Sequence, residues 1–474
     1  MISIKTFIKN YSKEISEGNA AIFAGAGLSV SAGFVSWKEL LRDIADELHL
    51  DVDKEHDLVA LAQYHLNENQ NRSQLNQRII EKFTAVSKLN LAHKYLSDLP
   101  IGTYWTTNYD NLIETSLEQN NKKVDKKIDQ RSLANNVPSR DAVVYKMHGD
   151  VLLPSEAIIT KDDYETYNEK RQLFRSVLQG DLISKTFVFI GFSFEDPNLS
   201  YILSRIRVLL GANKRSHYAF FRNTNKSDYS DERTYIYAQT KQALLIQDLK
   251  RYAINAIMLD EYNQIPEILL QLKKRNNIRN VFISGSAVEY GTWTQEDAVK
   301  LITGITSELI SAECKVITGF GLGIGSFVIN SAIQIITEKK YSHFDNYLEI
   351  NPFPFQLSTD QKEAFNKKYR DSILDHSGIA IFIFGNKSDG SKTIVADGVL
   401  NEYRIAREKG LYIIPIGSTN YAAKEIFDEV ASHISEFEYL RTDLEILKSE
   451  TKIPELLSAV KRILKIIIGG TDGS

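Results

Sequence analysis

The sequence of 474 residues is poor in cysteine and has no long apolar run. Its one cysteine, Cys314, cannot form a disulfide within the chain and cannot supply a four-cysteine zinc site. We therefore predict no bound metal. The longest apolar runs, such as 187–192 and 379–384, are far shorter than a membrane span. Because the amino-terminal residues contain no secretory apolar segment, the chain is predicted to be cytoplasmic and to have no membrane partner.

An excess of positive charge is also absent, because the formal net charge is -4. Binding to a phosphate backbone usually needs a basic surface, so we predict no nucleic-acid partner. The composition is otherwise that of a globular protein: 43% of the residues are hydrophobic and 25% are charged, with no low-complexity tract. A chain of this length exceeds one ordinary hydrophobic core, which predicts two domains and allows three.

Short apolar segments of strand length alternate with amphipathic segments of helical length. In the first half the predicted strands are 20–25, 102–108, 142–149, 186–194 and 253–260. In the second half they are 281–287, 315–325, 347–350, 380–386 and 411–417. Apolar strands separated by helices favour parallel sheets covered on both faces. The predicted fold class is α/β, with two Rossmann-like domains, each a mostly parallel sheet covered by helices.

The strongly polar and basic segment 271–280 is interpreted as the linker between the two domains. This interpretation places the domains at 1–275 and 276–474. The halves show no internal repeat, so they are separate domains of similar class. In the second domain, Ser358 followed by Gln361 predicts a capping box for a helix that carries Arg370.

A glycine-rich loop follows the first predicted strand. Its residues of interest are Ala24, Gly25, Ala26, Gly27 and Ser29. Glycine permits close approach of a ligand to the backbone, and the amides that follow can bind a pyrophosphate. A tight turn from strand to helix would use the same residues, so the loop alone does not identify a site.

Polar and small residues follow three further predicted strands. Asn108 and Asp110 follow the second strand, His148 follows the third, and Gly191 and Ser193 follow the fourth. Ligands bind at the carboxyl ends of the strands in an open α/β sheet. We therefore expect these residues to form one site with the glycine-rich loop. A lone histidine is usually structural, but a histidine at such a strand end is a candidate for chemistry.

Two aspartates near these strand ends have structural explanations as well. Asp196 precedes Pro197, and the pair is predicted to begin the following helix, with Asp196 as its cap. Asp110 either orients a neighbour in the site or caps a turn. The sequence does not decide between these two roles of Asp110.

The second half has two loops of small residues that suit a nucleotide. Ser284, Gly285 and Ser286 follow one strand, and a loop with Gly321 and Gly323 lies between a strand and a helix.

Charged residues recur further along, beside glycines and strand ends: Arg370, Lys387 and Glu402. The two cations would neutralise phosphates, and the carboxylate would accept hydrogen bonds from a ribose or a base. Taken singly, each such charge is more often a solvated surface residue, and only their recurrence beside glycines and strand ends makes a binding role equally favoured.

The motifs of the first half resemble the sirtuin family. They are a GAG-x-S loop at 25–29, a T-x-N-x-D strand end at 106–110 and H-G at 148–149, within roughly residues 10–270. The resemblance implies that the loop binds NAD, that Asn108 lies beside the nicotinamide ribose and that His148 is the general base.

Two departures from that family limit the chemistry. Sirtuin deacylases hold a zinc ion on two cysteine pairs, which this chain lacks, and segment 33–37 is GFVSW where deacylases have Pro-Asp-Phe. Protein deacylation is therefore disfavoured, which leaves cleavage of the nicotinamide glycosidic bond. That reaction needs a stabilised oxocarbenium-like ribose and a positioned water. Asn108 would hold the water or a ribose hydroxyl, and His148 would accept a proton from one of them.

The second half resembles the SLOG superfamily of nucleotide-binding domains. Its enzymes have a P-G-G-x-G-T-x-x-E loop with a catalytic glutamate, of which GVLNE at 398–402 keeps only a glycine and the glutamate. This departure favours sensing over catalysis. The pairing of both halves resembles the effector family of the bacterial Thoeris antiphage system, through stretches such as AIFAGAGLS, SGSAVEY and GFGLGIGSFVIN.

That second resemblance implies an NAD+ hydrolase that makes ADP-ribose and nicotinamide, depletes NAD in antiviral defence and needs no cofactor. It implies activation by a cyclic ADP-ribose isomer, made by a partner TIR-domain protein and bound through Arg370, Lys387 and Glu402. It also implies a homo-oligomer, a tetramer or a larger assembly. Three other functions stay open: an NAD-dependent deacylase or ADP-ribosyltransferase, a non-catalytic nucleotide-binding regulator, and a phosphoribohydrolase in the second half.

Overall fold

The computed structural model of the protein describes residues 2–84, 88–211, 213–339, 343–354 and 359–473. The chain divides into two compact units, Met1–Lys273 and Lys274–Ser474. The predicted capping box at Ser358 lies outside the described residues. Among the described helices, none combines the length and the apolar character that a bilayer crossing requires.

The N-terminal unit is built on a seven-stranded sheet in which every neighbouring pair is parallel. Across the sheet the strands are β3 (Val124–Lys127), β4 (Ala142–Lys146), β2 (Thr103–Thr106), β1 (Ala20–Ala24), β5 (Thr186–Ile190), β6 (His217–Arg222) and β7 (Ile254–Leu259). Five of these strands agree with the sequence prediction. The prediction missed β3, a largely polar edge strand, and β6, whose apolar residues are flanked by charges.

The strands of this sheet bury side chains on both faces, as a covered parallel sheet requires. In β1, Ile22 packs in a core with helices α1 and α7, whereas Phe23 packs on the other face with α10 and α11. The helices that flank the sheet are α1 (Ile4–Ser16), α6 (Leu91–Asp98), α7 (Leu112–Gln119), α9 (Tyr167–Lys170), α10 (Gln172–Ser184), α11 (Pro197–Leu210), α12 (Glu232–Leu249) and α13 (Ile265–Asn277).

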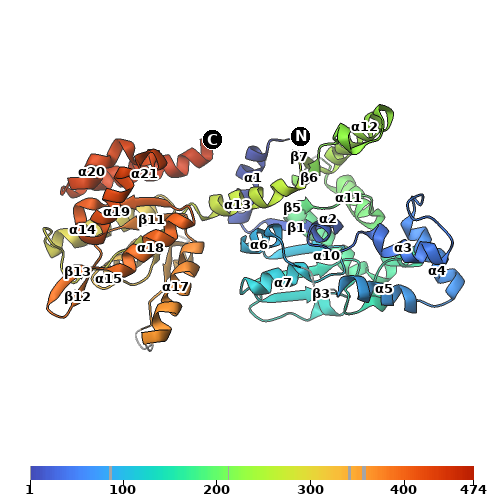
Figure 1. The fold of residues 1–474 in the computed structure, drawn as a ribbon, viewed down its shortest axis with the longest axis horizontal. Helices are drawn as coiled ribbons and strands as arrows, with labels where there is room; N and C mark the ends of the chain where they lie inside the picture. The colour runs from blue at the N-terminus through green and yellow to red at the C-terminus, as the bar shows by residue number, and fades with distance from the viewer. Residues whose placement is uncertain (1, 85–87, 212, 340–342, 355–358, 474) are drawn as a thin grey trace. The chain divides into compact units, whose positions relative to one another are not determined.

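A small group of helices between β1 and β2 forms its own hydrophobic core. It contains α3 (Trp37–Glu47), α4 (Leu58–Asn69) and α5 (Ser73–Phe83), and the later α8 (Lys161–Glu165) packs beside α4. The short helix α2 (Ala26–Val30) precedes them and buries Leu28 in the core that contains α1. Leu41, Leu61 and Ile79 are buried in the group's own core. Figure 1 shows α3 and α4 side by side at one end of the unit. We call this group the helical insert.

The C-terminal unit is built on a five-stranded parallel sheet and a short antiparallel hairpin. The sheet contains, in spatial order, β10 (Leu348–Ile350), β9 (Lys315–Thr318), β8 (Asn280–Ser284), β11 (Ile379–Phe382) and β14 (Tyr412–Pro415). The hairpin strands are β12 (Asn386–Asp389) and β13 (Lys392–Val395). The sequence predicted all five sheet strands but not the hairpin, whose residues other than Asn386 are exposed or half-buried.

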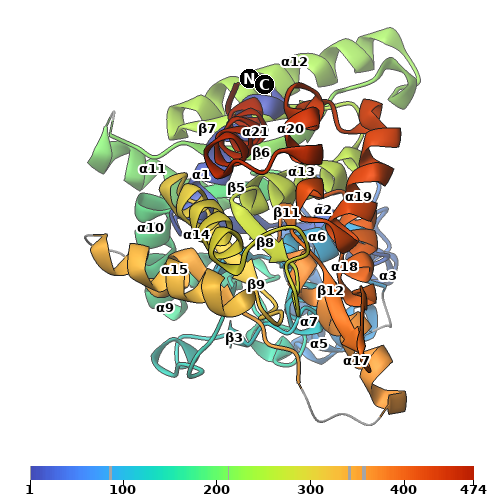
Figure 2. The same ribbon diagram turned by 90° about the vertical axis from the view of Figure 1, so that its left-hand side faces the viewer.

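Helices cover both faces of this second sheet. Figure 2 shows α14 and α15 on one side of the strands and α18 and α19 on the other. The helices of the unit are α14 (Gln295–Ser311), α15 (Gly325–Glu338), α16 (Phe344–Tyr347), α17 (Thr359–Asp375), α18 (Asp397–Glu408), α19 (Tyr421–Ser432), α20 (Leu444–Ser449) and α21 (Ile453–Gly473). The prediction of two α/β units with covered parallel sheets is confirmed.

The boundary between the two compact units falls inside the predicted linker segment 271–280, after Lys273. Helix α13 runs through most of it, and β8 begins at Asn280. The helix buries Leu269 and Leu272 in the core of the N-terminal unit. Its apolar spacing ends at Leu272, and the last turn is solvated and charged. That polar turn has the composition of a loop although the backbone is still helical.

Each sheet has one central strand at which the direction of strand addition reverses. In the N-terminal unit this is β1, which lies between β2 and β5. In the C-terminal unit it is β8, which lies between β9 and β11. The loop after the central strand and the loop after its neighbour run to opposite faces of the sheet, which leaves a crevice at the carboxyl ends of these two strands. Ligands of open α/β sheets bind in this crevice. In the N-terminal unit Gly25 and Gly27 follow β1 and Gly191 follows β5; in the C-terminal unit Ser284 is the last residue of β8 and Gly285 follows it.

Candidate active site

The loops after β1 and β5 meet backbone to backbone. Gly25 N donates to Ile190 O at 2.9 Å, and Gly27 N donates to Gly191 O at 2.9 Å. A Cβ atom on Gly25 would lie 2.4 Å from Gly191 O, and one on Gly191 would lie 2.4 Å from Leu28 N. Gly25, Gly27 and Gly191 therefore allow the loop after β1 and the loop after β5 to pack directly on each other. The sequence predicted either close approach of a ligand or a tight turn at Gly25 and Gly27, but not their contact with the loop after β5.

Substitution of Gly191 by alanine is expected to destabilise the N-terminal unit. The backbone at Gly191 has φ +65°, and the added Cβ would collide with the loop after β1. We expect the free energy of unfolding to fall by about 1–3 kcal/mol. The matched control is Gly180→Ala in the interior of α10, where a Cβ meets no atom within 4 Å. Thermal denaturation should show a lower midpoint for the first variant and an equal or higher midpoint for the second.

A buried hydrogen-bond network holds the loop after β2 against the glycine-rich loop. Asn108 Nδ2 donates to Gly25 O at 2.9 Å and to Ser29 Oγ at 2.7 Å. Ser29 Oγ donates to Asp110 Oδ2 at 2.6 Å, and Asp110 Oδ1 accepts from Leu112 N at 3.0 Å. Asp110 thus has both roles that the sequence left open, because one oxygen orients Ser29 and the other accepts the Leu112 amide in the turn that precedes α7.

His148 lies just past β4 and is 3% exposed. Its Nε2 is 2.9 Å from Asp196 Oδ2, within ion-pair range, although the ring nitrogen lacks hydrogen-bond alignment. The ring of Tyr164 packs edge-on at 5.5 Å between centroids. Asp196 Oδ1 accepts from Leu199 N at 2.8 Å, which confirms the predicted cap of α11. The sequence did not place Asp196 beside His148.

The Asp196 carboxyl is ionised at neutral pH. Burial would raise its pKa, but the His148 imidazole and the backbone amides of Leu199 and Asn198 hold it below its usual range. A fixed negative charge therefore faces His148 from the start of α11.

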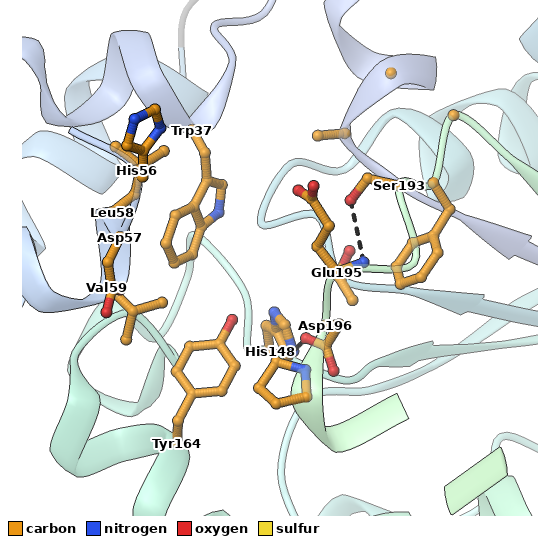
Figure 3. A pocket seen from close by; sticks show the side chains of 16 residues that line it. Trp37, His56, Asp57, Leu58, Val59, His148, Tyr164, Ser193, Glu195 and Asp196 are labelled. Atoms are coloured by element: carbon orange, nitrogen blue, oxygen red, sulfur yellow. Dashed lines mark hydrogen bonds and ion pairs between the residues drawn. The ribbon is translucent and has the colours of Figure 1, made fainter. Parts of the chain in front are cut away.

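His148 and Asp196 open onto a cavity of about 490 Å³ between the helical insert and the carboxyl edge of the sheet. Figure 3 shows Trp37 and Tyr164 on one side of this cavity and His148, Asp196 and Ser193 on the other. Its other lining residues are Ala26, Gly27, His56, Asp57, Leu58, Val59, Thr107, Gly191, Phe192, Glu195 and Pro197.

The helical insert supplies a wall that the sequence did not assign to the site. Trp37 and residues 56–59 line the cavity from α3 and the start of α4. Because these residues are far from the strand ends in the sequence, only the packing of the insert brings them to the cavity. Trp37 belongs to the GFVSW stretch, which departs from the deacylase pattern. That departure was the one indication in the sequence that this segment takes part in the site.

Asn108 lines a smaller, neighbouring cavity of about 50 Å³ together with Ser29 and Asp110. The two cavities share Ala26, Trp37 and Thr107. The predicted residues of the glycine-rich loop, of β2 and of β4 therefore surround one region. Within the described residues, however, the side chains of Asn108 and His148 are turned to different partners. Ala24 itself is fully buried as the last residue of β1.

A buried ionic cluster lies beneath the ends of β2 and β4. Lys146 Nζ is 3.4 Å from Glu114 Oε1 and 3.5 Å from Asp150 Oδ2, and it also donates to Asp110 O. Burial alone would lower the pKa of Lys146, but the carboxylates of Glu114 and Asp150 raise it above its usual value. Burial also raises the pKa of Glu114. Lys146 thus connects the loop of Asp110 to the strand that ends at His148.

In the C-terminal unit the structure brings together three of the predicted residues. Ser284 Oγ donates to Glu402 Oε2 at 2.6 Å, and Arg370 Nε donates to Glu402 Oε1 at 3.2 Å. The Arg370 guanidinium also stacks 4.8 Å from the ring of Phe353. Burial raises the pKa of Glu402. These side chains lie at the carboxyl end of β8, the central strand of the sheet.

The remaining predicted residues of this unit differ in placement. Lys387 is on the exposed hairpin and pairs with Asp397, so it does not join the Ser284–Glu402–Arg370 group in this structure. Gly321 and Gly323 allow the loop after β9 to pack on the backbone of the loop after β8, at Gly285 and Ala287.

Ser286 and Asn386 hold that loop in place. Ser286 Oγ donates to Asn386 O at 2.8 Å. The sequence missed the role of Asn386, which is 1% exposed and bonds the backbone of Val288 and Glu289.

Within the described part of the chain, no group of three or more His, Cys, Asp or Glu side chains is arranged to hold a metal ion. The cavity beside the helical insert presents the His148 imidazole and the Asp196 carboxylate, and the smaller neighbouring cavity presents the buried Asn108 amide.

Comparisons with known proteins define first the class and then the family. Residues 102–246 match the model of the SIR2-like domain, and residues 264–467 match the Sir2- and TIR-associating SLOG family. The chain is thus a SIR2-like domain followed by a SLOG domain. It is 45% identical to "NAD(+) hydrolase ThsA" of Acinetobacter baumannii, over 98% of this chain and 99% of that protein. It is 44% identical to the protein of the same name from Bacillus cereus, over 98% and 97%.

The chain therefore belongs to the ThsA family, and the predicted resemblance is confirmed. A more distant relative is "Defense-associated sirtuin 2" of Bacillus subtilis, which is 25% identical over 57% of this chain and 27% of that protein.

Proposed function

We propose that this protein hydrolyses NAD+ to nicotinamide and ADP-ribose in antiviral defence. The observation that carries the proposal is that His148 lines a cavity at the point where the strand order reverses, beside the glycine-rich loop. Membership of a family whose relatives are named NAD(+) hydrolase supports it. The volume of the cavity is within the range of small-molecule sites.

The reaction breaks the bond between ribose C1′ and the nicotinamide nitrogen and forms one between C1′ and a water oxygen. The pyridinium takes the electron pair of the broken bond and leaves as neutral nicotinamide, so no acid is needed. His148 accepts a proton from the water or from a ribose hydroxyl, and the proton then passes to solvent. Asn108, once its amide turns from Ser29, would hold the water or a ribose hydroxyl. The mechanism requires no metal and no further cofactor.

The second part of the proposal is activation by a cyclic ADP-ribose isomer bound to the C-terminal unit. The isomer would be made by a TIR-domain protein. Arg370 and Lys387 would contact its phosphates, and Glu402 its ribose or base. The Ser284–Glu402–Arg370 group supports a polar ligand at this strand end. We further propose a homo-oligomer, a tetramer or larger, as the regulated form.

Activation of this kind is a shift between two states of the protein. The isomer can raise the active population only by as much as it binds the active state more tightly. In the present structure the Arg370 guanidinium forms an ion pair with Glu402, and the Lys387 ammonium forms one with Asp397. A phosphate that replaced these carboxylates would break both ion pairs and change the positions of the segments that carry Arg370 and Lys387. Such a change is one way for the isomer to bind the active state more tightly.

The decisive experiment is incubation of the purified protein with NAD+, with and without cyclic ADP-ribose isomers, with nicotinamide and ADP-ribose measured by chromatography. We expect equal amounts of both products, formed faster when the correct isomer is present. Absence of nicotinamide under every condition would contradict the proposal. Modified protein or turnover of acetyl-lysine would then favour the transferase or deacylase alternatives.

Substitution of Arg370 by alanine is expected to abolish activation. Loss of one guanidinium–phosphate contact should weaken binding of the isomer by about 10- to 100-fold, since charge-assisted hydrogen bonds contribute about 1.5–3 kcal/mol. Calorimetry with the isomer measures the affinity, and nicotinamide release measures the activation. The matched control is Arg404→Ala, at an exposed arginine of α18 that bonds Asn401. Unchanged affinity in the Arg370 variant would contradict this assignment.

A further inference from the structure

Both oxygens of the Asp196 carboxylate lie against polar groups. Oδ1 accepts the Leu199 amide at the first turn of α11, a helix of 14 residues, and Oδ2 lies 2.9 Å from Nε2 of His148. The Asp196 side chain is 7% exposed and still borders the same cavity as His148. A helix cap alone would need only one of these oxygens. The second oxygen is directed at the histidine that the proposed reaction uses.

We propose that Asp196 is a positioning residue for NAD+ cleavage, which holds the His148 imidazole in place and stabilises its protonated form. The inference rests on the proposed function and extends it, because it explains how a buried histidine accepts a proton. When His148 takes the proton of the water or of a ribose hydroxyl, a positive charge forms on the ring. The negative carboxylate at 2.9 Å stabilises that charge, in the way a carboxylate supports the histidine of a catalytic triad.

The other groups around His148 do not supply this charge. Tyr164 of α8 and Tyr167 of α9 face the ring at 5.5 and 6.5 Å, and burial raises the pKa of both phenols, so they stay neutral. Asp150 and Lys146, on the same strand end, are paired with each other. Among the residues that line the cavity, His56, Asp57 and Glu195 are exposed to solvent.

The capping role and the charge role of Asp196 can be separated by substitution. Asparagine and serine cap helices about as well as aspartate, so Asp196→Asn and Asp196→Ser keep the cap but remove the charge. The matched control is Asp231→Asn at the cap of α12, where the carboxylate accepts from Thr234 N at 2.9 Å and lies on the surface. We expect all three variants to melt close to the unsubstituted protein.

Nicotinamide release over a range of pH tests the charge role. For both Asp196 variants we expect kcat to fall by at least about tenfold, with a much smaller change in KM for NAD+. Without the carboxylate the imidazolium is less stable, so His148 stays neutral to lower pH. The acidic limb of the profile should therefore move to lower pH in Asp196→Asn. Asp231→Asn should retain the rate and the profile of the unsubstituted protein.

Two results would overturn the inference while leaving the proposed function intact: unchanged kcat in both Asp196 variants, or a lower kcat with an unmoved acidic limb. If the unsubstituted protein releases no nicotinamide, the proposed function fails, and the pair is tested by NMR of histidine-labelled protein. The His148 signal is identified by its loss in His148→Asn. If the His148 signal titrates at lower pH in Asp196→Asn than in the unsubstituted protein, the pairing is supported. If it titrates at the same pH in both proteins, the pairing is overturned.

Discussion

Substitution of His148 by asparagine is expected to lower the rate of NAD+ cleavage by about 10²- to 10⁴-fold, which is the usual contribution of a general base. The loss should appear in kcat, because asparagine can still fill part of the buried space between Tyr164 and Asp196 but cannot accept a proton. Nicotinamide release in the presence of the activating isomer, measured at saturating NAD+, checks the size of the loss.

The matched control is His49→Asn, the same substitution at an exposed histidine just past α3. The backbone there has φ 58°, a conformation that asparagine tolerates well, so we expect no loss of stability or activity. A His148→Asn variant that keeps more than about a tenth of the rate would exclude His148 as the general base. Its melting midpoint distinguishes loss of chemistry from loss of fold.

Substitution of Lys146 by methionine is expected to lower the free energy of unfolding by about 3–5 kcal/mol. Methionine fills a similar volume, but it leaves the buried Glu114 and Asp150 carboxylates without their shared cation, and only Asp150 keeps another, Lys126 at 3.1 Å. An unpaired buried charge is far more costly than the loss of one contact. Denaturant unfolding measures the effect, and Lys94→Met, at an exposed position of α6, should change stability by less than about 0.5 kcal/mol.

The deficit of the Lys146 variant should depend on pH. Burial raises the pKa of Glu114 in the folded protein, and removal of Lys146 raises it further. A carboxyl whose folded pKa exceeds its unfolded value binds more protons in the folded state, so stability falls as pH rises through the folded pKa. We therefore expect a smaller deficit near about pH 5 than near about pH 7.5. A double variant with Glu114→Gln should recover part of the loss, and an equal deficit at both pH values would contradict this explanation.

The sequence alone predicted those features that depend on local pattern. Apolar runs of four to six residues between amphipathic segments identify buried parallel strands, because both faces of such strands are covered. The residues that follow these strands, Asn108 and His148 among them, could be placed at one edge of the sheet, since parallel strands all end there. The cap at Asp196 with Pro197 was also predictable, because capping is a contact with residues two or three positions away.

The features that the sequence did not determine are contacts between side chains far apart in the chain. Asp196 faces His148 only because β5 and β4 belong to the same sheet and α11 begins at its carboxyl edge. Trp37 reaches the cavity through the packing of the helical insert. Lys387, expected beside Arg370, is instead on a hairpin of two short strands that lack the alternation of apolar and polar residues that would have predicted them.

The glycines of the site also show which features the sequence predicts and which depend on the tertiary structure. The GAG loop and Gly191 identify places where the backbone must come close to something. Whether that partner is a ligand or another strand-end loop depends on strand order, which places the segment after β5 directly against the loop after β1. Residue type and spacing thus determined the apolar strands, the cap at Asp196 and the residues available for chemistry. The tertiary structure decided which of these residues meet, because strand order and helix packing are set by the burial of the whole core.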